Sequence, residues 1–270
     1  LKMEEDELER QAKLLEERFA YIDDKAVTVS LRNAHLGLVG EREVILEQLQ
    51  LIAVQLTFQQ SYHDLQIILI HHKKYEEEFG WMRWYPHLTV QSLNLSGDIR
   101  SEQMRDQVLG SLFQILKDRK LKVEEGSKAS RFLPHFVFVI DEPKLVMDHS
   151  IMEYLNKPGR DLGFSVIYTS YLRGNLPEAV GTVVELHDSE EATLLLKENR
   201  VVNKRFRLSH TGDCGLEWMA RNLSVLVHDP GVTSKIPESI TFFEMYGVKR
   251  PEEFRSEERW KKNQSHRSLA

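Results

Sequence analysis

The chain has 270 residues, of which 41% are hydrophobic and 29% charged, and its formal net charge at pH 7 is −6. This composition suits one large α/β domain with a packed core and argues against global disorder. The negative charge argues against a general nucleic-acid binder, so we expect no nucleic-acid partner. A single cysteine excludes an internal disulfide and is typical of a reducing compartment. No stretch reaches the roughly 20 apolar residues of a transmembrane helix.

Strand-like and helix-like patterns alternate along the chain. Charge and leucine alternate at helical spacing in residues 4–20, which predicts an amphipathic helix. Strands are predicted at 27–31, 34–39, 64–70, 136–140, 164–169 and 182–186, with 205–208 pairing at an edge. Further helices are predicted from 43 to about 60, from a cap at Ser101, around 148–157 and over 215–227, and loops over 71–90 and 122–131. This alternation predicts an α/β fold, with a mostly parallel sheet that carries helices on both faces.

The apolar run at 136–140 predicts a buried strand that ends in two carboxylates, Asp141 and Glu142. P-loop ATPases end their metal-binding strand in the same way. In that interpretation Asp141 orients a hydrated Mg²⁺ and is the candidate metal ligand, while Glu142 polarises the attacking water. The alternative is that the two acids only end a strand and cap the helix that begins at Pro143.

The phosphate loop that should accompany this strand is incomplete. Where G-x-x-x-x-G-K-[ST] is expected, residues 37–43 read GLVGERE and lack both the lysine and the hydroxyl residue. Gly40 still leads a strand into a helix, Arg42 is the nearby cation, and Thr169 ends the strand where a γ-phosphate sensor is expected. These three residues are the candidate nucleotide contacts.

Two acidic residues stand in the turn where a phosphate loop would carry its phosphate-binding residues. Glu41 and Glu43 fall in the first helical turn, where they complement the helix dipole themselves and repel a phosphate. The sequence therefore predicts a P-loop-NTPase-like domain that lacks the usual phosphate loop. We expect no cofactor in this segment; ATP with Mg²⁺ at a divergent site is the alternative.

A dense aromatic segment follows the third predicted strand. Trp81, Trp84 and His87 lie within a W-x-x-W-x-P-H sequence and are candidates for docking a partner, since exposed aromatic residues make good anchors. The same residues could fold back as a small core. His71 and His72 have no cysteine or acid at zinc-ligand spacing, so we expect no metal site among them.

Several segments together resemble the EssC/EccC (YukBA-like) family, the membrane ATPases of type VII (ESX) protein secretion in the FtsK/SpoIIIE class. These segments are the VGER turn at 39–42, the aromatic segment at 79–88, and residues 139–142, 159–164 and 240–248. The resemblance covers roughly residues 20–270. It is to the cytosolic module between the transmembrane helices and the first complete ATPase domain, and it implies a RecA/FtsK-like fold.

The resemblance also implies an arrangement within a longer protein. Residues 1–25 would be an amphipathic stalk helix, 26–248 a degenerate FtsK/SpoIIIE-like ATPase domain, and 249–270 a charged linker to a following ATPase domain. The parent would be an integral membrane motor that is hexameric when assembled. This segment would lie at the cytoplasmic face of the bacterial cell membrane and be a monomer when isolated.

The partners implied are other domains of the same ATPase, type VII membrane-complex components and secreted WXG-type substrates. The leading hypothesis is a pseudo-ATPase module that couples the ATPase domains to the membrane channel. One alternative is a divergent but active ATPase that uses Asp141 and Glu142, so whether this segment is an enzyme stays open. The other is a pure docking module that binds through Trp81, Trp84 and His87.

Overall fold

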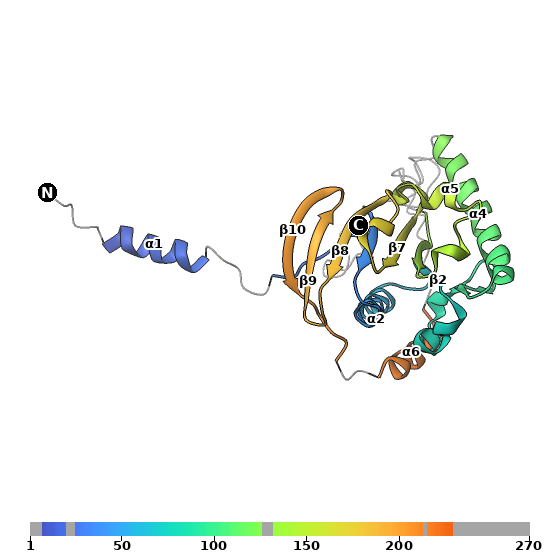
Figure 1. Ribbon diagram of the computed structural model, residues 1–270, viewed down its shortest axis with the longest axis horizontal. Helices are drawn as coiled ribbons and strands as arrows, with labels where there is room; N and C mark the ends of the chain where they lie inside the picture. The colour runs from blue at the N-terminus through green and yellow to red at the C-terminus, as the bar shows by residue number, and fades with distance from the viewer. Residues whose placement is uncertain (1–6, 20–24, 126–131, 213–214, 229–270) are drawn as a thin grey trace, which may run out of the picture. The chain divides into compact units, whose positions relative to one another are not determined.

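The computed structural model describes residues 7–19, 25–125, 132–212 and 215–228 (Figure 1). The chain divides into two compact units, 1–227 and 228–270. The predicted amphipathic helix is present as α1 (Glu7–Phe19). The predicted linker at 249–270 and the family segment at 240–248 lie outside the described residues. Within the described ranges, no helix is both long enough and apolar enough to cross a membrane.

One eight-stranded sheet forms the centre of the first unit, in the order β10-β9-β8-β1-β7-β6-β2-β5. Its strands are β1 (His35–Val39), β2 (Leu65–Ile70), β5 (Asp98–Ile99), β6 (His135–Ile140), β7 (Phe164–Ser170), β8 (Val180–Leu186), β9 (Glu191–Lys197) and β10 (Arg200–Arg207). All pairs from β8 to β5 are parallel, and β9 and β10 are antiparallel additions. A separate short pair joins β3 (Thr89–Val90) to β4 (Leu95–Ser96). The predicted mostly parallel sheet is confirmed.

Helices cover both faces of this sheet (Figure 1), as predicted. Successive strand residues point to opposite faces, so Ile67 packs in the cluster that contains α2 (Arg42–Gln59), and Ile68 packs in the cluster that contains α4 (Glu102–Glu124). The other helices are α3 (Glu76–Phe79), α5 (Met152–Leu155) and α6 (Leu216–Ser224). Single 3₁₀ turns are η1 (Lys73–Tyr75), η2 (Gly80–Trp84), η3 (Pro86–Leu88), η4 (Pro143–Leu145), η5 (Arg160–Leu162) and η6 (Arg173–Asn175).

The structure corrects several predicted elements. Residues 27–31, predicted as a strand, form none; their alternating apolar side chains instead pack onto the core from an irregular segment. α4 continues to Glu124, into the predicted loop at 122–131, and the helix expected around 148–157 is reduced to α5. β9 was not predicted, and it pairs with β10 across a turn in which Glu198 and Asn199 have positive φ.

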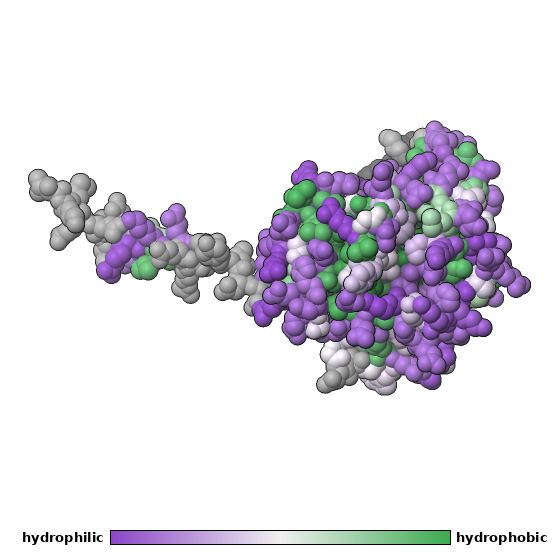
Figure 2. Space-filling view, viewed as in Figure 1, coloured by the Kyte–Doolittle hydropathy of each residue, from purple (hydrophilic) through white to green (hydrophobic). Residues whose placement is uncertain are grey.

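The antiparallel side of the sheet ends in an exposed edge. Every residue of β10 but one is exposed, and Val201 is 82% exposed. Figure 2 shows hydrophobic residues gathered over this side of a mostly hydrophilic surface. Four basic residues on β10 and a shift of register between Val201 and Lys204 interrupt this edge, which disfavours pairing with a further strand.

A buried arginine and a partly buried histidine mark the amino edge of the parallel strands. Arg119 of α4 is 6% exposed and donates hydrogen bonds to the carbonyl oxygens of Pro134, Leu162 and Gly163 at 2.9, 2.9 and 3.2 Å. Burial lowers the pKa of Arg119 to about 10. Nearby, the Nε2 atom of His135 lies 2.9 Å from the hydroxyl of Ser165.

The His135 imidazole makes the free energy of unfolding depend on pH. Burial, with the positive charges of Arg119 and Arg32, lowers its pKa from 6.5 to about 4. Between pH 6.5 and pH 4, the His135 imidazole is therefore protonated in the unfolded chain but stays neutral in the folded chain. We expect the free energy of unfolding to fall by up to about 3 kcal/mol between pH 6.5 and pH 4.

Urea unfolding across this pH range, in the wild type and in His135→Gln, measures the effect. The glutamine keeps a hydrogen-bonding partner for Ser165 and cannot titrate, so its free energy of unfolding should fall less steeply with acid. Equal slopes for the two proteins would show that His135 carries none of the pH dependence.

Candidate functional site

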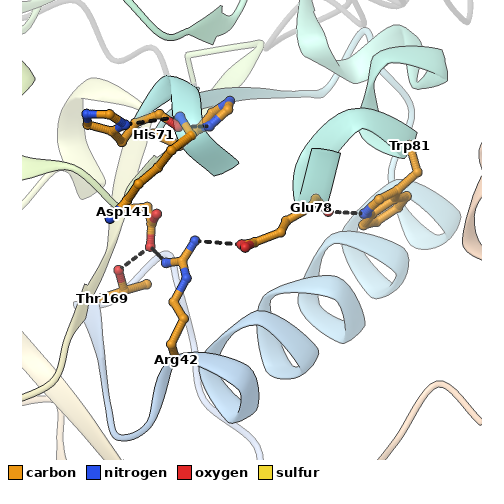
Figure 3. A network of polar contacts seen from close by, with 8 residues as sticks. Arg42, His71, Glu78, Trp81, Asp141 and Thr169 are labelled. Atoms are coloured by element: carbon orange, nitrogen blue, oxygen red, sulfur yellow. Dashed lines mark hydrogen bonds and ion pairs between the residues drawn. The ribbon is translucent and has the colours of Figure 1, made fainter. Parts of the chain in front are cut away.

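The candidate residues of the nucleotide site meet at the carboxyl edge of the sheet. The chain runs outward from β1 to β2, returns through β6 and β7, and then crosses to β8 on the other side of β1. Ligands of open parallel sheets bind outside the carboxyl ends of the strands, where the strand order reverses in this way. Asp141 follows β6, Thr169 ends β7 and Arg42 opens α2, so the structure brings three predicted site residues together (Figure 3).

An ion pair between Arg42 and Asp141 occupies this edge. An Nη1 hydrogen of Arg42 is donated to Oδ1 of Asp141, whose side chain is only 1% exposed, while that of Arg42 is 29% exposed. A buried carboxylate is costly unless a counter-charge and hydrogen bonds satisfy it. The guanidinium supplies that counter-charge directly.

Three further side chains hold the ion pair in place. The hydroxyl of Thr169 donates to the same Asp141 oxygen at 2.8 Å, and Nη2 of Arg42 donates to Glu78 of α3 at 3.0 Å. The guanidinium carbon also lies 3.8 Å from the ring centroid of Tyr75 in η1. Bridging two carboxylates while stacking on an aromatic ring suits the planar fork of arginine better than lysine.

The electrostatics of the site keep Arg42 charged. Burial alone would lower the pKa of the guanidinium, but the carboxylates of Asp141 and Glu78 more than offset that effect and raise the pKa above its usual value. A charged Arg42 therefore lies within hydrogen-bonding distance of the carboxylate that a metal ion would need.

Gly40 connects β1 to α2 but does not open a space for a phosphate. Its N–H donates to the carbonyl oxygen of Ser170 at 3.1 Å. A Cβ atom at this position would lie 2.8 Å from both the Cβ and the carbonyl oxygen of Leu186 in β8. The absence of a side chain thus allows Gly40 to pack closely against β8. Its N–H is hydrogen-bonded to Ser170 and is not open to a phosphate.

The remaining acids of the site face other groups. Glu142 accepts a hydrogen bond from the backbone N–H of Lys144 at 3.4 Å, the capping geometry of the alternative interpretation. Glu41 is the N-cap residue of α2 without a side-chain hydrogen bond to that helix, and Glu43 lies in its first turn. Both acids contribute negative charge where a phosphate would have to approach.

These observations do not fit a bound magnesium nucleotide. Such a ligand needs a carboxylate free to reach the metal or its water, backbone N–H groups open to phosphate, and a cation for the β- and γ-oxygens. Here Asp141 is bound to Arg42 and Thr169, and the N–H of Gly40 is bound to β7. One oxygen of Asp141 and Nε of Arg42 are nevertheless buried without a hydrogen-bond partner among the described residues.

The aromatic segment folds against the body of the domain. His87 is 1% exposed, and its Nε2 lies 2.8 Å from the carbonyl oxygen of Gln60, so it offers no surface to a partner in this structure. Trp81 and Trp84 are partly buried and pack against the core. The indole N–H of Trp84 donates to Glu217 of α6 at 3.1 Å. Docking through the two tryptophans stays a prediction.

The histidines at the end of β2 belong to the fold. Nε2 of His71 lies 2.9 Å from a carboxylate oxygen of Asp98, and its Nδ1 lies 3.0 Å from the carbonyl oxygen of His72. In the described ranges, no group of three or more His, Cys, Asp or Glu side chains is arranged to hold a metal ion.

Sequence reasoning missed two residues of this site, Tyr75 and Glu78. Both lie in the segment predicted as a loop, and their role depends on how that segment folds back over the end of β6. The dense clustering of acids and aromatic residues at 75–85 was the available signal, but it did not identify Arg42 as their partner.

Comparison with known proteins finds relatives among secretion system proteins. No protein-family model matches the chain. The type VII secretion system protein EssC of Staphylococcus aureus is 33% identical over 268 residues, and the ESX secretion system protein YukB of Bacillus subtilis is 32% identical over 265 residues. Each alignment covers 98% of this chain and 18% of the relative, so the chain spans about a fifth of these proteins.

A solved structure shows the same fold at low sequence identity. The cytoplasmic domain of the type VII secretion ATPase EccC from Thermomonospora curvata superposes with a TM-score of 0.51 at 13% identity, over 73% of this chain and 28% of that one. At this identity the likeness concerns the fold alone. The predicted α/β, P-loop-NTPase-like fold class is confirmed.

The ion pair predicts a specific pattern of stabilities. Arg42→Met leaves the buried Asp141 charge without a partner, so we expect the free energy of unfolding to fall by about 3 kcal/mol. Adding Asp141→Asn removes that charge and should restore most of the loss, because the amide still accepts from Thr169.

Urea unfolding of the two single variants and the double variant measures the coupling between these residues. Glu78→Gln is the matched control: its side chain is 37% exposed, so its loss should cost about 1 kcal/mol or less. Additive effects of Arg42→Met and Asp141→Asn would contradict a stabilising pair.

Proposed function

Because this chain is homologous to one segment of the type VII secretion proteins EssC and YukB, we propose that it is a pseudo-ATPase module of a secretion motor. Its role would be structural and regulatory: it would couple the ATPase domains of a longer protein to the membrane channel through which WXG-type proteins are exported. The expected place is the cytoplasmic face of the cell membrane, and the expected parent assembly is a hexamer.

The ion pair between Arg42 and Asp141 is the observation that carries this proposal. In an active site of this fold, the acid after the β6-equivalent strand serves a metal ion, and the turn after the first strand serves phosphate. Here a side chain from that same turn neutralises the acid. The positive charge that a metal would bring is thus supplied permanently by the protein, in a form that cannot carry a nucleotide.

Retaining the fold without the catalytic groups is consistent with a coupling role. A module that packs like its neighbouring ATPase domains offers them the same kind of surface while contributing no turnover of its own. Proposed partners are therefore the other domains of the same protein and the type VII membrane-complex components. Secreted WXG-type proteins are proposed as substrates of the parent motor.

One observation favours a second candidate function, a divergent ATPase. The second carboxylate oxygen of Asp141 is buried and has no hydrogen-bond partner among the described residues. Buried acceptors are normally satisfied, so this oxygen could receive a ligand if Arg42 turned away. Asp141 and Glu142 would then take the metal-binding and water-polarising roles, with Mg²⁺ and ATP as cofactors.

Calorimetry distinguishes the two candidates. ATP with Mg²⁺ is titrated to millimolar concentration into the wild-type protein and into an Asp141→Ala, Glu142→Ala variant. A pseudo-ATPase gives no binding heat in either case. Micromolar binding that the variant loses would overturn the proposal and establish the acid pair as a nucleotide site.

A secretion assay with the full-length parent protein tests the role of Glu142 separately. Glu142→Gln keeps an oxygen that can cap the backbone N–H of Lys144 but cannot act as a general base. We expect secretion to remain at the wild-type level. Loss of a working base normally lowers a rate by a factor of about 10² to 10⁴, so a secretion defect of that size at unchanged protein level would favour the enzyme.

A further inference from the structure

A cavity of about 420 Å³ lies at the amino edge of the sheet, at the opposite ends of the strands from the Arg42–Asp141 pair. Its walls come from the starts of β2, β6 and β7, the end of α2, and the irregular segment that precedes β1. This volume is within the range of small-molecule sites, which typically enclose about 300 to 1,000 Å³.

Two arginines line this cavity without a hydrogen-bond or ion-pair partner among the described residues. Arg32 comes from the segment before β1, and Arg160 opens η5. Neither guanidinium makes a hydrogen bond or ion pair with any residue in the described part of the chain. Arginine carries a planar fork of donors that matches a carboxylate or phosphate, so both groups are available to bind an oxyanion.

The electrostatic field at the base of the cavity is also positive. His135 lies there beside Ser165, and the positive charges of Arg119 and Arg32 act on its imidazole. Asp64 is the acidic residue among those that line the cavity, and it is exposed at the end of the preceding turn. Cations therefore outnumber acids around this space.

Apart from Gln60, the rest of the wall is largely apolar. Leucine and valine side chains from α2, β2 and β6 form it, together with an exposed leucine before β6; these are Leu56, Leu65, Val137 and Leu133. An apolar wall excludes water and strengthens an ion pair formed at its rim. The lining thus combines an apolar wall with two positively charged side chains. Such a surface is complementary to an amphiphilic anion.

We propose that this cavity binds a small organic anion, a carboxylate or phosphate monoester carried on an apolar body. The head group would lie between Arg32 and Arg160, and the body against Leu56 and Val137. Because Arg32 belongs to the segment that leads from the N-terminal helix to β1, such a ligand would tie that segment to η5 and the start of β6.

Calorimetry with four ten-carbon probes tests the charge preference. Decanoate and decyl phosphate carry the two proposed heads, while decanol and decyltrimethylammonium are the neutral and cationic controls, all used below their micelle concentrations. We expect saturable one-to-one binding of at least one anion, weaker binding of decanol and none of the cation. The stronger of the two anions identifies the preferred head group.

Substitutions at the rim and wall locate the site. Arg32→Gln and Arg160→Gln should each weaken anion binding about tenfold or more at unchanged melting temperature, since neither guanidinium has a partner to lose in the described part of the chain. Leu56→Trp should fill the cavity and weaken decanol as well. Arg173→Gln, on η6 at the carboxyl side of β7, is the matched control and should leave all affinities unchanged.

Nuclear magnetic resonance of His135 provides a readout that does not depend on heat. An anion bound between the arginines raises the His135 pKa from about 4, whereas binding elsewhere leaves it unchanged. Equal affinity for the anionic and cationic probes, unchanged binding in both arginine variants, or no binding of either anion would overturn the proposal.

Discussion

The contact between Arg42 and Asp141 is the constraint on which the carboxyl edge of this domain depends. Asp141 is almost fully buried at the end of a central strand, and a carboxylate in that position must be neutralised. The arginine that does so opens α2, and its guanidinium in turn fixes Tyr75 and Glu78. A single cation therefore joins β6, α2 and the segment after β2, which are far apart in the sequence.

The two edges of the sheet differ in how their charges are satisfied. At the carboxyl edge, where this fold class places nucleotides, the central acid is paired within the protein. At the amino edge, Arg119 donates hydrogen bonds to backbone carbonyl groups, while Arg32 and Arg160 line an apolar space. The carboxyl edge therefore has its central acid paired within the protein, whereas the amino edge places two arginines beside an apolar space.

An element of the fold could be predicted from the sequence where its signal is local, and could not where it depends on residues far away in the chain. The strands at 64–70 and 136–140 are continuous apolar runs, so their burial on both faces could be read locally. Residues 27–31 have the alternation of a strand, but alternation reports only a half-buried surface and not a pairing partner. The fold order was therefore recoverable, and the irregular segment and β9 were not.

The candidate site shows the same limit more sharply. Asp141, Thr169 and Gly40 were identified because strand ends carry a local pattern. The function of Arg42 was not evident, because its acidic partner lies 99 positions away and its second partner lies in a segment predicted as a loop. A sequence can show that a lysine is missing, whereas only the fold shows that an arginine neutralises the acid that a metal ion would otherwise meet.

The burial of Asp141 also has an evolutionary consequence. A chain that carries this ion pair cannot gain a metal-binding carboxylate by substitution of Arg42 alone, since removal of Arg42 leaves an unpaired buried acid and a less stable protein. Metal binding at Asp141 would require the loss of Arg42 together with the gain of a lysine, a hydroxyl residue and the metal ion itself. Selection for a stable fold alone would therefore keep Arg42 beside Asp141.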